Sequence, residues 1–345
     1  MSSKDKPSTN ITIADVAALA GVSRAIASRA LSPEDRPVSA EKKAKVLAAA
    51  EQLGFKPNLI ARSLKSRTLN LVAVIVNHIH DFSDLVLFDR LIAAIQDTGK
   101  QVVLLRVGSL DRVEEFLRNG VAWHVDAALV FSDFANAATV RTMFRTNRIV
   151  MLNGMRDDTA PSIVADEATP IAAAVAHARA RGKSRGVLVT GRQTSPVEQA
   201  RIAAYRAAFA AQGLTLSAEH AGDYSYESGR SLSAAVLRDG PEAAIFATAD
   251  AMAMGVIDAG RADIARKPGD WAIYGFDALP LARSEAYPIS SIGYDLDTYI
   301  ARVIDHLRQP ELFEEPAGVI TIPGSFMPHP SCGGPAAFER WPAEG

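Results

Sequence analysis

Few side chains in this sequence combine in the types and spacings that catalysis requires. The run RGKS at residues 181–184 matches the end of a phosphate-binding loop, but His177 stands where that loop requires glycine. No GxGxxG follows an apolar run, so no dinucleotide site is expected, and no GxSxG nucleophile motif occurs. The sequence therefore predicts neither an enzyme nor a bound cofactor.

Two histidines offer the one candidate metal site. His78, His80 and Asp81 could lie on one face of a strand end and bind a metal ion. Because no further ligand follows at a fixed spacing, loop histidines are the simpler interpretation and no metal is expected. The single cysteine, Cys332, excludes an internal disulfide and a zinc site built from several cysteines.

The composition is that of an ordinary globular protein. The chain has 345 residues, of which 48% are hydrophobic and 22% charged, enough for two or three domains. No apolar run approaches the roughly eighteen residues of a membrane helix. The polar N-terminus lacks the apolar core and cleavage site of a signal peptide. We expect a cytoplasmic protein without a membrane partner.

Charge is divided unevenly along the chain. Residues 1–70 contain twelve Lys and Arg against six Asp and Glu, a net charge of +6. The rest contains 25 Lys and Arg against 33 Asp and Glu, a net charge of −8. A basic head on an acidic body is typical of proteins whose small domain meets a polyanion.

The basic head has the signals of three short helices. Thr12 and Asp15 form a capping-box pattern before the apolar spacing of TIADVAALA, and Gly21 provides a left-handed stop. Ser23 is a good N-cap for a second helix that runs to about Leu31. Ser39 begins a third, with Gly54 past its end. Two short helices joined by a glycine turn form a helix-turn-helix unit.

Three spaced motifs in this head carry a resemblance. TIADVAALAGVS, SRALS and VSAEKKAKVLAAAEQLGFKPNLIARSLKSRT, within residues 11–68, resemble the DNA-binding head of the lactose-repressor (LacI/GalR) family. The resemblance implies a transcriptional regulator, and most simply a repressor, that binds double-stranded DNA at a palindromic operator. Because twofold proteins read palindromes, a homodimer is expected.

The resemblance assigns roles to residues of the second helix. It places Arg24, Ala25 and Arg29 against base edges of the major groove, where arginine can fork onto guanine and alanine can contact a thymine methyl. A solvated or phosphate-facing charge is the alternative for Arg24. Phosphate contacts, which set position without reading sequence, fall to Thr12, Ser23, Ser28 and Asn58. The family usually has threonine at the position of Ile26, which puts one phosphate contact in doubt.

A short segment after the head resembles the family's hinge helix. Pro57 prevents the third helix from continuing, and Asn58 can cap a new helix through Leu64 that is too short to be stable alone. The resemblance implies that it folds on DNA, with Leu64 wedged between base steps in the minor groove and Ala61 allowing close approach of its dimer mate. A polar linker is the alternative.

Beyond Asn70 the pattern becomes that of an α/β protein. Apolar runs at 71–76, 101–107, 127–131, 148–153, 186–190, 243–248 and 271–276 predict strands buried on both faces of parallel sheets, with amphipathic helices between them. Together with this pattern, the resemblance implies an all-α helix-turn-helix head plus a two-lobed α/β core, similar to periplasmic binding proteins. Chain crossings between lobes are expected near 159–162, 290–292 and 321–324.

These patterns also predict where each domain begins and ends. The helix-turn-helix domain spans 1–56, the hinge 57–69 and the ligand-binding and dimerisation core 70–345. In the core, lobe 1 takes about 70–160 and 292–321, and lobe 2 about 161–291 and 322–334. The C-terminus lacks leucine heptads, so a tetramerising coiled coil is not expected.

A small-molecule effector is expected between the lobes, at the carboxyl ends of the strands. The resemblance places contacts at Asn153, Arg201 and Asp277, and at Ala249-Asp250 where the family normally has Asn-Asp. The lost amide favours a ligand less hydroxylated than a typical sugar, or one bearing a carboxylate or phosphate that Arg201 clamps with two hydrogen bonds. Arg201 in a structural ion pair is the alternative, and Asp250 is expected to cap the following helix. Phe82 is a candidate for stacking.

The expected mechanism is a two-state switch in which the effector changes the angle between the lobes and so controls pairing of the hinge helices. Two alternatives come from other classes of protein. A cytoplasmic sugar-binding or carboxylate-binding protein with a dispensable head would show negligible affinity for DNA. A sugar-phosphate or nucleoside enzyme on this scaffold would turn its ligand over, but no catalytic group supports it.

Overall fold

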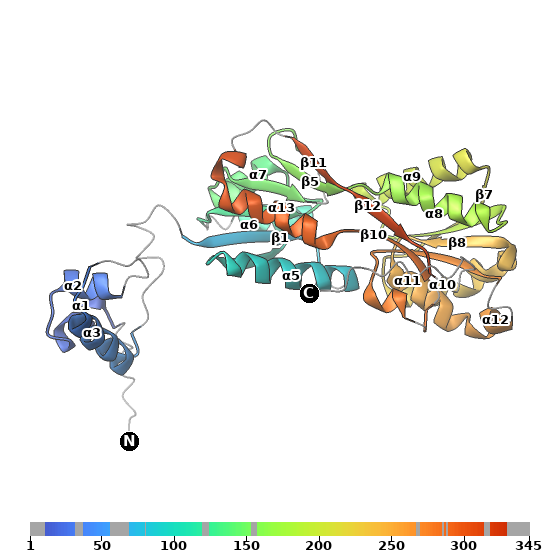
Figure 1. The fold of residues 1–345 in the computed structure, drawn as a ribbon. Helices are drawn as coiled ribbons and strands as arrows, with labels where there is room; N and C mark the ends of the chain where they lie inside the picture. The colour runs from blue at the N-terminus through green and yellow to red at the C-terminus, as the bar shows by residue number, and fades with distance from the viewer. Residues whose placement is uncertain are drawn as a thin grey trace, which may run out of the picture. The chain divides into compact units, whose positions relative to one another are not determined.

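The computed structural model describes residues 11–31, 37–55, 69–79, 81–118, 124–152, 157–266, 270–284, 286–287, 289–313 and 318–329. The chain divides into two compact units, residues 1–69 and 70–345 (Figure 1). Seven residues singled out in the sequence lie outside the described residues, namely Pro57, Asn58, Ala61, Leu64, His80, Asn153 and Cys332.

The first unit contains the three predicted helices, α1 (Ile13–Leu19), α2 (Arg24–Ala30) and α3 (Ala40–Leu53). The Asp15 carboxylate accepts hydrogen bonds of 2.7 Å from both the backbone N–H and the hydroxyl of Thr12, which fixes the start of α1. Gly21 has the positive φ of 64° that the turn between α1 and α2 requires. The predicted start, turn and stop of this helix pair are confirmed.

Small side chains build the core of this unit. Its buried residues are Val16, Ala17, Ala27, Ala30, Val46, Ala49 and Ala50. Alanines let short helices cross closely, and the resulting core is too small to provide much stability by itself.

The second unit contains two six-stranded sheets with the same strand order. The sheet of lobe 1 runs β11-β5-β4-β3-β1-β2 and is parallel throughout. The sheet of lobe 2 runs β12-β10-β9-β8-β6-β7, with only β12 antiparallel. The predicted α/β architecture is confirmed.

The strands of lobe 1 are β1 (Leu71–Val76), β2 (Gln101–Arg106), β3 (Ala127–Phe131), β4 (Ile149–Leu152), β5 (Ser162–Ala165) and β11 (Val319–Ile322). Its helices are α5 (Phe82–Asp97), α6 (Leu110–Arg118), α7 (Ala137–Phe144) and α13 (Leu296–Arg308), with the 3₁₀ turn η3 (Pro310–Phe313).

The strands of lobe 2 are β6 (Arg185–Thr190), β7 (Thr215–Ala221), β8 (Ala243–Ala247), β9 (Ala272–Phe276), β10 (Ile289–Tyr294) and β12 (Gly324–Met327). Its helices are α8 (Ala168–Ala180), α9 (Pro196–Gln212), α10 (Tyr226–Val236), α11 (Asp250–Ala259) and α12 (Arg261–Arg266), with 3₁₀ turns η1 (Leu237–Glu242) and η2 (Pro280–Arg283).

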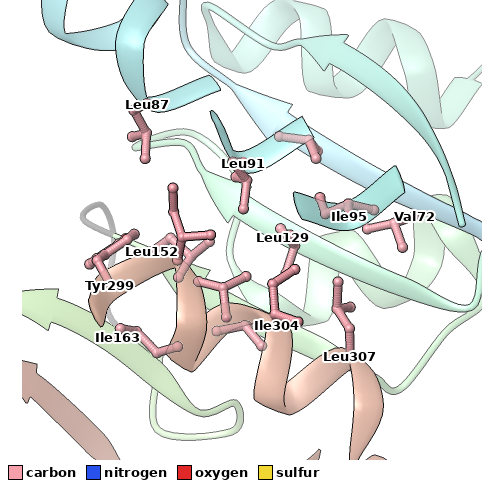
Figure 2. Close-up of a cluster of buried hydrophobic side chains, with 14 of the residues drawn as sticks. Val72, Leu87, Leu91, Ile95, Leu129, Leu152, Ile163, Tyr299, Ile304 and Leu307 are labelled. Carbon is pink, nitrogen blue, oxygen red and sulfur yellow. The ribbon is translucent and has the colours of Figure 1, made fainter. Parts of the chain in front are cut away.

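Both sheets are covered by helices on both faces. In β1, Val72, Val74 and Val76 pack under α5 and α13, whereas Ala73 and Ile75 pack toward α6 and α7. Figure 2 shows side chains of α5 and α13 meeting over one face of the lobe 1 sheet. Burial on both faces explains why these strands read as continuous apolar runs.

Two of the three crossings between lobes lie later than expected. Residues 162–165 form β5, which pairs with β4 and β11, so the first crossing follows Ala165 rather than 159–162. Residues 289–294 form β10 in lobe 2, so the second follows Tyr294 rather than 290–292. The third lies between β11 and β12, at Pro323. Lobe 1 thus comprises 70–165 and 295–322, and lobe 2 comprises 166–294 and 323–329.

Five strands were not predicted, and their sequences explain why. The strands β5, β11 and β12 have only four residues each, and β7 is a half-exposed edge strand with polar positions. In β10, Ser290 and Ser291 interrupt the apolar run although both are buried.

In the described part of the chain, no helix has the length and apolar character to cross a membrane.

Helices α10 and α11 pack against each other at glycine. A Cβ added at Gly229 would lie 2.1 Å from the carbonyl oxygen of Met252, and backbone cannot yield as a side chain can. Gly229→Ala is therefore expected to destabilise the core by about 1–3 kcal/mol, measured by urea denaturation. Ser231→Ala, on the exposed side of α10, should change stability by less than about 0.5 kcal/mol. An unchanged midpoint for Gly229→Ala would contradict this packing.

Candidate functional site

One side of α2 presents a polar surface to solvent. Arg24, Ala25, Ser28 and Arg29 are exposed, whereas Ala27 and Ala30 are buried against the other two helices. The exposed positions are separated by one, three, four or five residues, which places them on one face of the helix. The Nε of Arg29 donates to the Ala25 carbonyl at 3.2 Å, which holds the arginine stem along the helix.

The predicted phosphate ligands of the head lie at helix starts. The Ser23 hydroxyl oxygen accepts a 3.3 Å hydrogen bond from the N–H of Ile26 and remains able to donate its own proton. The Thr12 hydroxyl donates to Asp15, so it offers an anion no proton in this arrangement. Both residues are exposed.

A cavity of about 460 Å³ lies between the lobes of the second unit. It is lined by residues that follow the carboxyl ends of strands in both lobes, among them Asn77 after β1, Asp133 after β3, Arg192 after β6, Ala249 after β8 and Asp277 after β9. Parallel strands bring their carboxyl ends to one edge, where α/β folds hold ligands. The size fits a small metabolite.

The four described residues predicted to contact an effector all line this cavity. They are Phe82 at the start of α5, Arg201 in α9, Ala249 before α11 and Asp277 after β9. Phe82 has a 46% exposed side chain, so it is available for stacking. The alanine at 249 offers the cavity a methyl group only.

The paired N–H donors of the Arg201 guanidinium are already bonded within the protein and are not free for an anionic ligand. Its Nε and Nη2 donate to the two oxygens of Glu167 at 2.9 and 2.6 Å, and Nη1 donates to the Thr248 carbonyl at 2.9 Å. Its guanidinium carbon lies 3.7 Å from the centre of the Phe276 ring. The expected clamp on a ligand carboxylate or phosphate is therefore wrong for this arrangement, because an internal carboxylate takes both hydrogen bonds.

A second carboxylate lies behind Arg201. Glu198 is fully buried and accepts hydrogen bonds from the Gly191 N–H at 2.6 Å, the Thr248 hydroxyl at 2.7 Å and the Tyr224 hydroxyl at 2.9 Å. It also lies 3.8 Å from Nη1 of Arg201. A buried carboxylate with so many donors fixes the loop after β6.

Asp277 follows β9 with a φ of 100° and donates its backbone N–H to the Ile292 carbonyl at 2.7 Å. Burial raises the pKa of its carboxyl well above the ordinary value. The charge of Asp250 raises this pKa further, as do those of Asp81 and Asp84, whereas Arg201 lowers it. The carboxyl thus meets more negative than positive charge.

Asp250 does not cap its helix as expected. The N-cap of α11 is Ala249, and the Asp250 carboxylate instead accepts hydrogen bonds from the Leu279 N–H at 2.8 Å and the Ser291 hydroxyl at 2.7 Å. Because β9 and β10 bring Leu279 and Ser291 beside this carboxylate, their donors take it away from the helix end.

Side chains reach across the cavity from one lobe to the other. Nη2 of Arg192, from lobe 2, donates to Asp81 of lobe 1 at 3.2 Å and also contacts Nε2 of His78. Burial raises the pKa of the Asp133 carboxyl in lobe 1, and Ser195 of lobe 2 lies close enough to lower that pKa in part. Among the described residues, Asp84 joins the predicted pair of His78 and Asp81, with its carboxylate 3.1 Å from Nδ1 of His78. Their ligand atoms lie within 4.8 Å of one another, and Arg192 supplies positive charge there.

Several residues in the cavity wall or directly behind it were not identified from the sequence. Asn77 directly follows the apolar run 71–76, and Asp133 stands two residues after the run 127–131; polar residues at such places are a signal that could have identified them. Glu167 and Glu198 lie in helical or loop runs that resemble any exposed acidic position. Only the neighbours that surround them reveal their role.

Comparison with known families divides the chain in the same way. Residues 12–58 match the family described as bacterial regulatory proteins, lacI family, and residues 175–320 match the periplasmic binding protein-like domain.

Two relatives match most of the chain. The catabolite control protein A of Priestia megaterium is 27% identical over 330 residues, covering 91% of this chain and 97% of the relative. The HTH-type transcriptional regulator AscG of Escherichia coli (strain K12) is 28% identical over 310 residues, covering 86% and 90%. A solved Lac repressor dimer, bound to operator and the anti-inducer ONPF, shares the fold with a TM-score of 0.78, at 22% identity, covering 94% of this chain and 99% of that one.

The environment of Asp277 predicts a pH-dependent stability. Because the pKa is raised in the folded state, folding takes up a proton, and the stability present below the unfolded pKa is lost as pH rises through the folded pKa. The Asp277→Asn variant has no carboxyl at this position and so does not lose this stability as the pH rises. The melting temperature of the variant minus that of the parent, measured by scanning calorimetry, should therefore increase from about pH 5 to about pH 8.

The control is Asp223→Asn. The hydrogen bond from the Ser225 side chain lowers the pKa of Asp223, so this carboxylate stabilises the fold at every pH in that range. The Asp223→Asn variant should melt lower than the parent by a nearly constant amount. If Asp277→Asn melts below the parent at the upper end of the range, the carboxylate is favourably held and the interpretation is wrong.

Proposed function

Because the chain belongs to the lacI family of bacterial regulatory proteins, we propose that it is a cytoplasmic transcriptional repressor that binds a palindromic operator as a homodimer. A small molecule in the cavity between the lobes controls its affinity for that operator. The Lac repressor, whose fold this chain shares, has been solved bound to its operator together with an anti-inducer.

The observation that carries this proposal is the exposed face of α2. A short helix fits the major groove of B-DNA, and its first residues reach base edges there. Arg24 and Arg29 supply donors for guanine, and Ala25 supplies apolar contact for thymine. Ser23 and Ser28 bind phosphates beside them, and the net charge of +6 over residues 1–70 attracts the backbone.

The segment after the head has its own role in the proposal. Asn58, Ala61 and Leu64 form a hinge helix that enters the minor groove when the protein is on its operator. Since the hinge joins the head to lobe 1, movement of the lobes changes whether two hinges can pair.

Lobe 1 offers a surface for the second protomer. Leu85 and Val86 on α5 are 51% and 38% exposed, and Leu104 on β2 is 40% exposed. The helix α5 packs on β2, an edge strand whose outer backbone groups have no neighbour in the sheet. Exposed apolar side chains beside an open strand edge fit a dimer contact.

The effector acts through the contacts between lobes. Arg192 and Ser195 of lobe 2 already contact Asp81 and Asp133 of lobe 1. A ligand that contacts Asp277, Phe82, Ala249, Asn153 or the remaining donors of Arg201 changes the balance of these bonds. DNA and effector must then alter each other's affinity by the same factor.

Arg24→Ala tests the DNA assignment. With full-length protein and a random duplex library, the parent should select a palindrome, and the variant should lose its preference at one base of each half-site, about 1–3 kcal/mol. Arg206→Ala, an exposed arginine of lobe 2, should leave the base profile unchanged. An unaltered profile for Arg24→Ala refutes its role, and no palindrome preference in the parent refutes the proposed function.

Leu85→Asp tests the dimer surface. A buried carboxylate at the contact should raise the dimer dissociation constant about tenfold or more, close to 1.4 kcal/mol, in sedimentation equilibrium. Leu281→Asp in lobe 2 is matched, since Leu281 is 50% exposed. If both variants remain dimeric at the same concentrations, the contact lies elsewhere.

A further inference from the structure

The wall of the cavity carries an excess of negative charge. Among its described residues are five carboxylates, Asp81, Asp84, Asp133, Glu167 and Asp277, against three guanidinium groups, those of Arg106, Arg192 and Arg201. Below the wall, Glu198 and Asp250 are fully buried as well. A cavity lined in this way attracts cations and repels anions.

Two of the three guanidinium groups are already committed. Arg201 donates twice to Glu167 and once to the Thr248 carbonyl. Arg192 donates to Asp81 and to the Asp223 carbonyl, and lies 4.8 Å from the ring centre of Tyr224. An anionic ligand would have to displace a protein carboxylate to reach either of them.

Asp277 is the carboxyl with the least compensation. In the part of the chain that the structure describes, its side chain makes no hydrogen bond or ion pair, yet it lines the cavity. The negative charges of Asp250 in lobe 2 and of Asp81 and Asp84 at the start of α5 in lobe 1 disfavour the ionised form of this carboxyl. The positive charge of Arg201 in α9 favours the ionised form. Like charges thus meet across the cavity from opposite lobes.

Aromatic rings complete the wall. They include Phe82 and Phe131 from lobe 1, and Tyr224, Phe276 and Tyr294 from lobe 2. The negative face of an aromatic ring attracts cations, and quaternary ammonium groups are recognised by such rings together with carboxylates.

We propose that the effector is an organic cation, an ammonium compound with apolar or ring carbon atoms, whose charge sits between Asp277 of lobe 2 and Asp84 of lobe 1. The cation cancels the repulsion between these carboxylates and so draws the lobes together, while its carbon atoms pack on the rings. This deepens the proposed function and rests on it only for the consequence at the operator.

Other classes of ligand would interact favourably with fewer of the groups that line the cavity. A carboxylate or phosphate finds two of the three lining arginines, Arg192 and Arg201, already paired within the protein. A neutral polyol can donate to Asp277 but leaves the excess charge uncancelled. A divalent metal ion offers the same cancellation and could use His78 with Asp81 and Asp84, but it gives the rings no role.

The test compares ligands that differ only in charge. Full-length protein is titrated calorimetrically with glucosamine against glucose and 2-phenylethylamine against 2-phenylethanol. Tetramethylammonium chloride is compared with sodium chloride at equal ionic strength in thermal melts. At least one amine should bind about tenfold more tightly than its alcohol, and tetramethylammonium should raise the melting temperature more than sodium does. The variant Asp277→Asn should lose both preferences.

Asp158→Asn, which changes a carboxylate outside the cavity lining, is the matched control and should keep both preferences. Equal responses to amine and alcohol throughout, with no advantage of tetramethylammonium over sodium, overturn the proposal. A melting shift with magnesium or manganese chloride but not with any amine overturns it in favour of a metal ion.

The consequence at the operator is measured separately. If an amine binds but leaves operator affinity unchanged, the ligand class stands and the allosteric part of the proposed function fails. If a sugar or a carboxylate compound shifts operator affinity while no amine binds, the proposed function stands and the cationic effector is refuted.

Discussion

The ion pair between Arg201 and Glu167 organises the cavity floor. A buried guanidinium is costly unless its donors are satisfied, and here Glu167 at the start of α8, Glu198 in α9 and the Thr248 carbonyl after β8 surround it, with the Phe276 ring against it. Four elements of lobe 2 are held by one side chain. The same pairing occupies the two donors of Arg201 that an anionic ligand would need for a bidentate contact.

The three crossings of the chain place two similar sheets with their carboxyl ends toward a shared cavity. Each lobe is an independent set of packed layers with its own cores, and side-chain contacts join the two lobes across the cavity. Arg192 with Asp81, and Ser195 with Asp133, are contacts of this kind. A ligand that adds bonds at this position can shift the balance between two lobe arrangements, since the lobe cores need not repack.

The N-terminal head has a much smaller core than either lobe. Its core consists largely of alanine, so it buries little apolar surface. The exposed residues on the outer side of α2 take no part in this core. A small domain of this kind gains its affinity from charge, from a few base contacts and from its duplication in a dimer. The proposed dimer contact in the core would supply that duplication.

The sequence alone determined whatever depends on near neighbours. Helix starts at Thr12 and Ser23, the stop at Gly21 and the buried strands were predictable because caps, left-handed turns and two-sided burial leave signals within a few residues. It also placed Arg201 and Asp277 at the cavity, through motifs. Only the tertiary structure decided that residues 162–165 join lobe 1, that Asp250 holds Leu279 and Ser291 rather than a helix end, and that Glu167 occupies Arg201. Each depends on a partner distant in the chain, and the energy of a buried charge is set by the atoms that surround it.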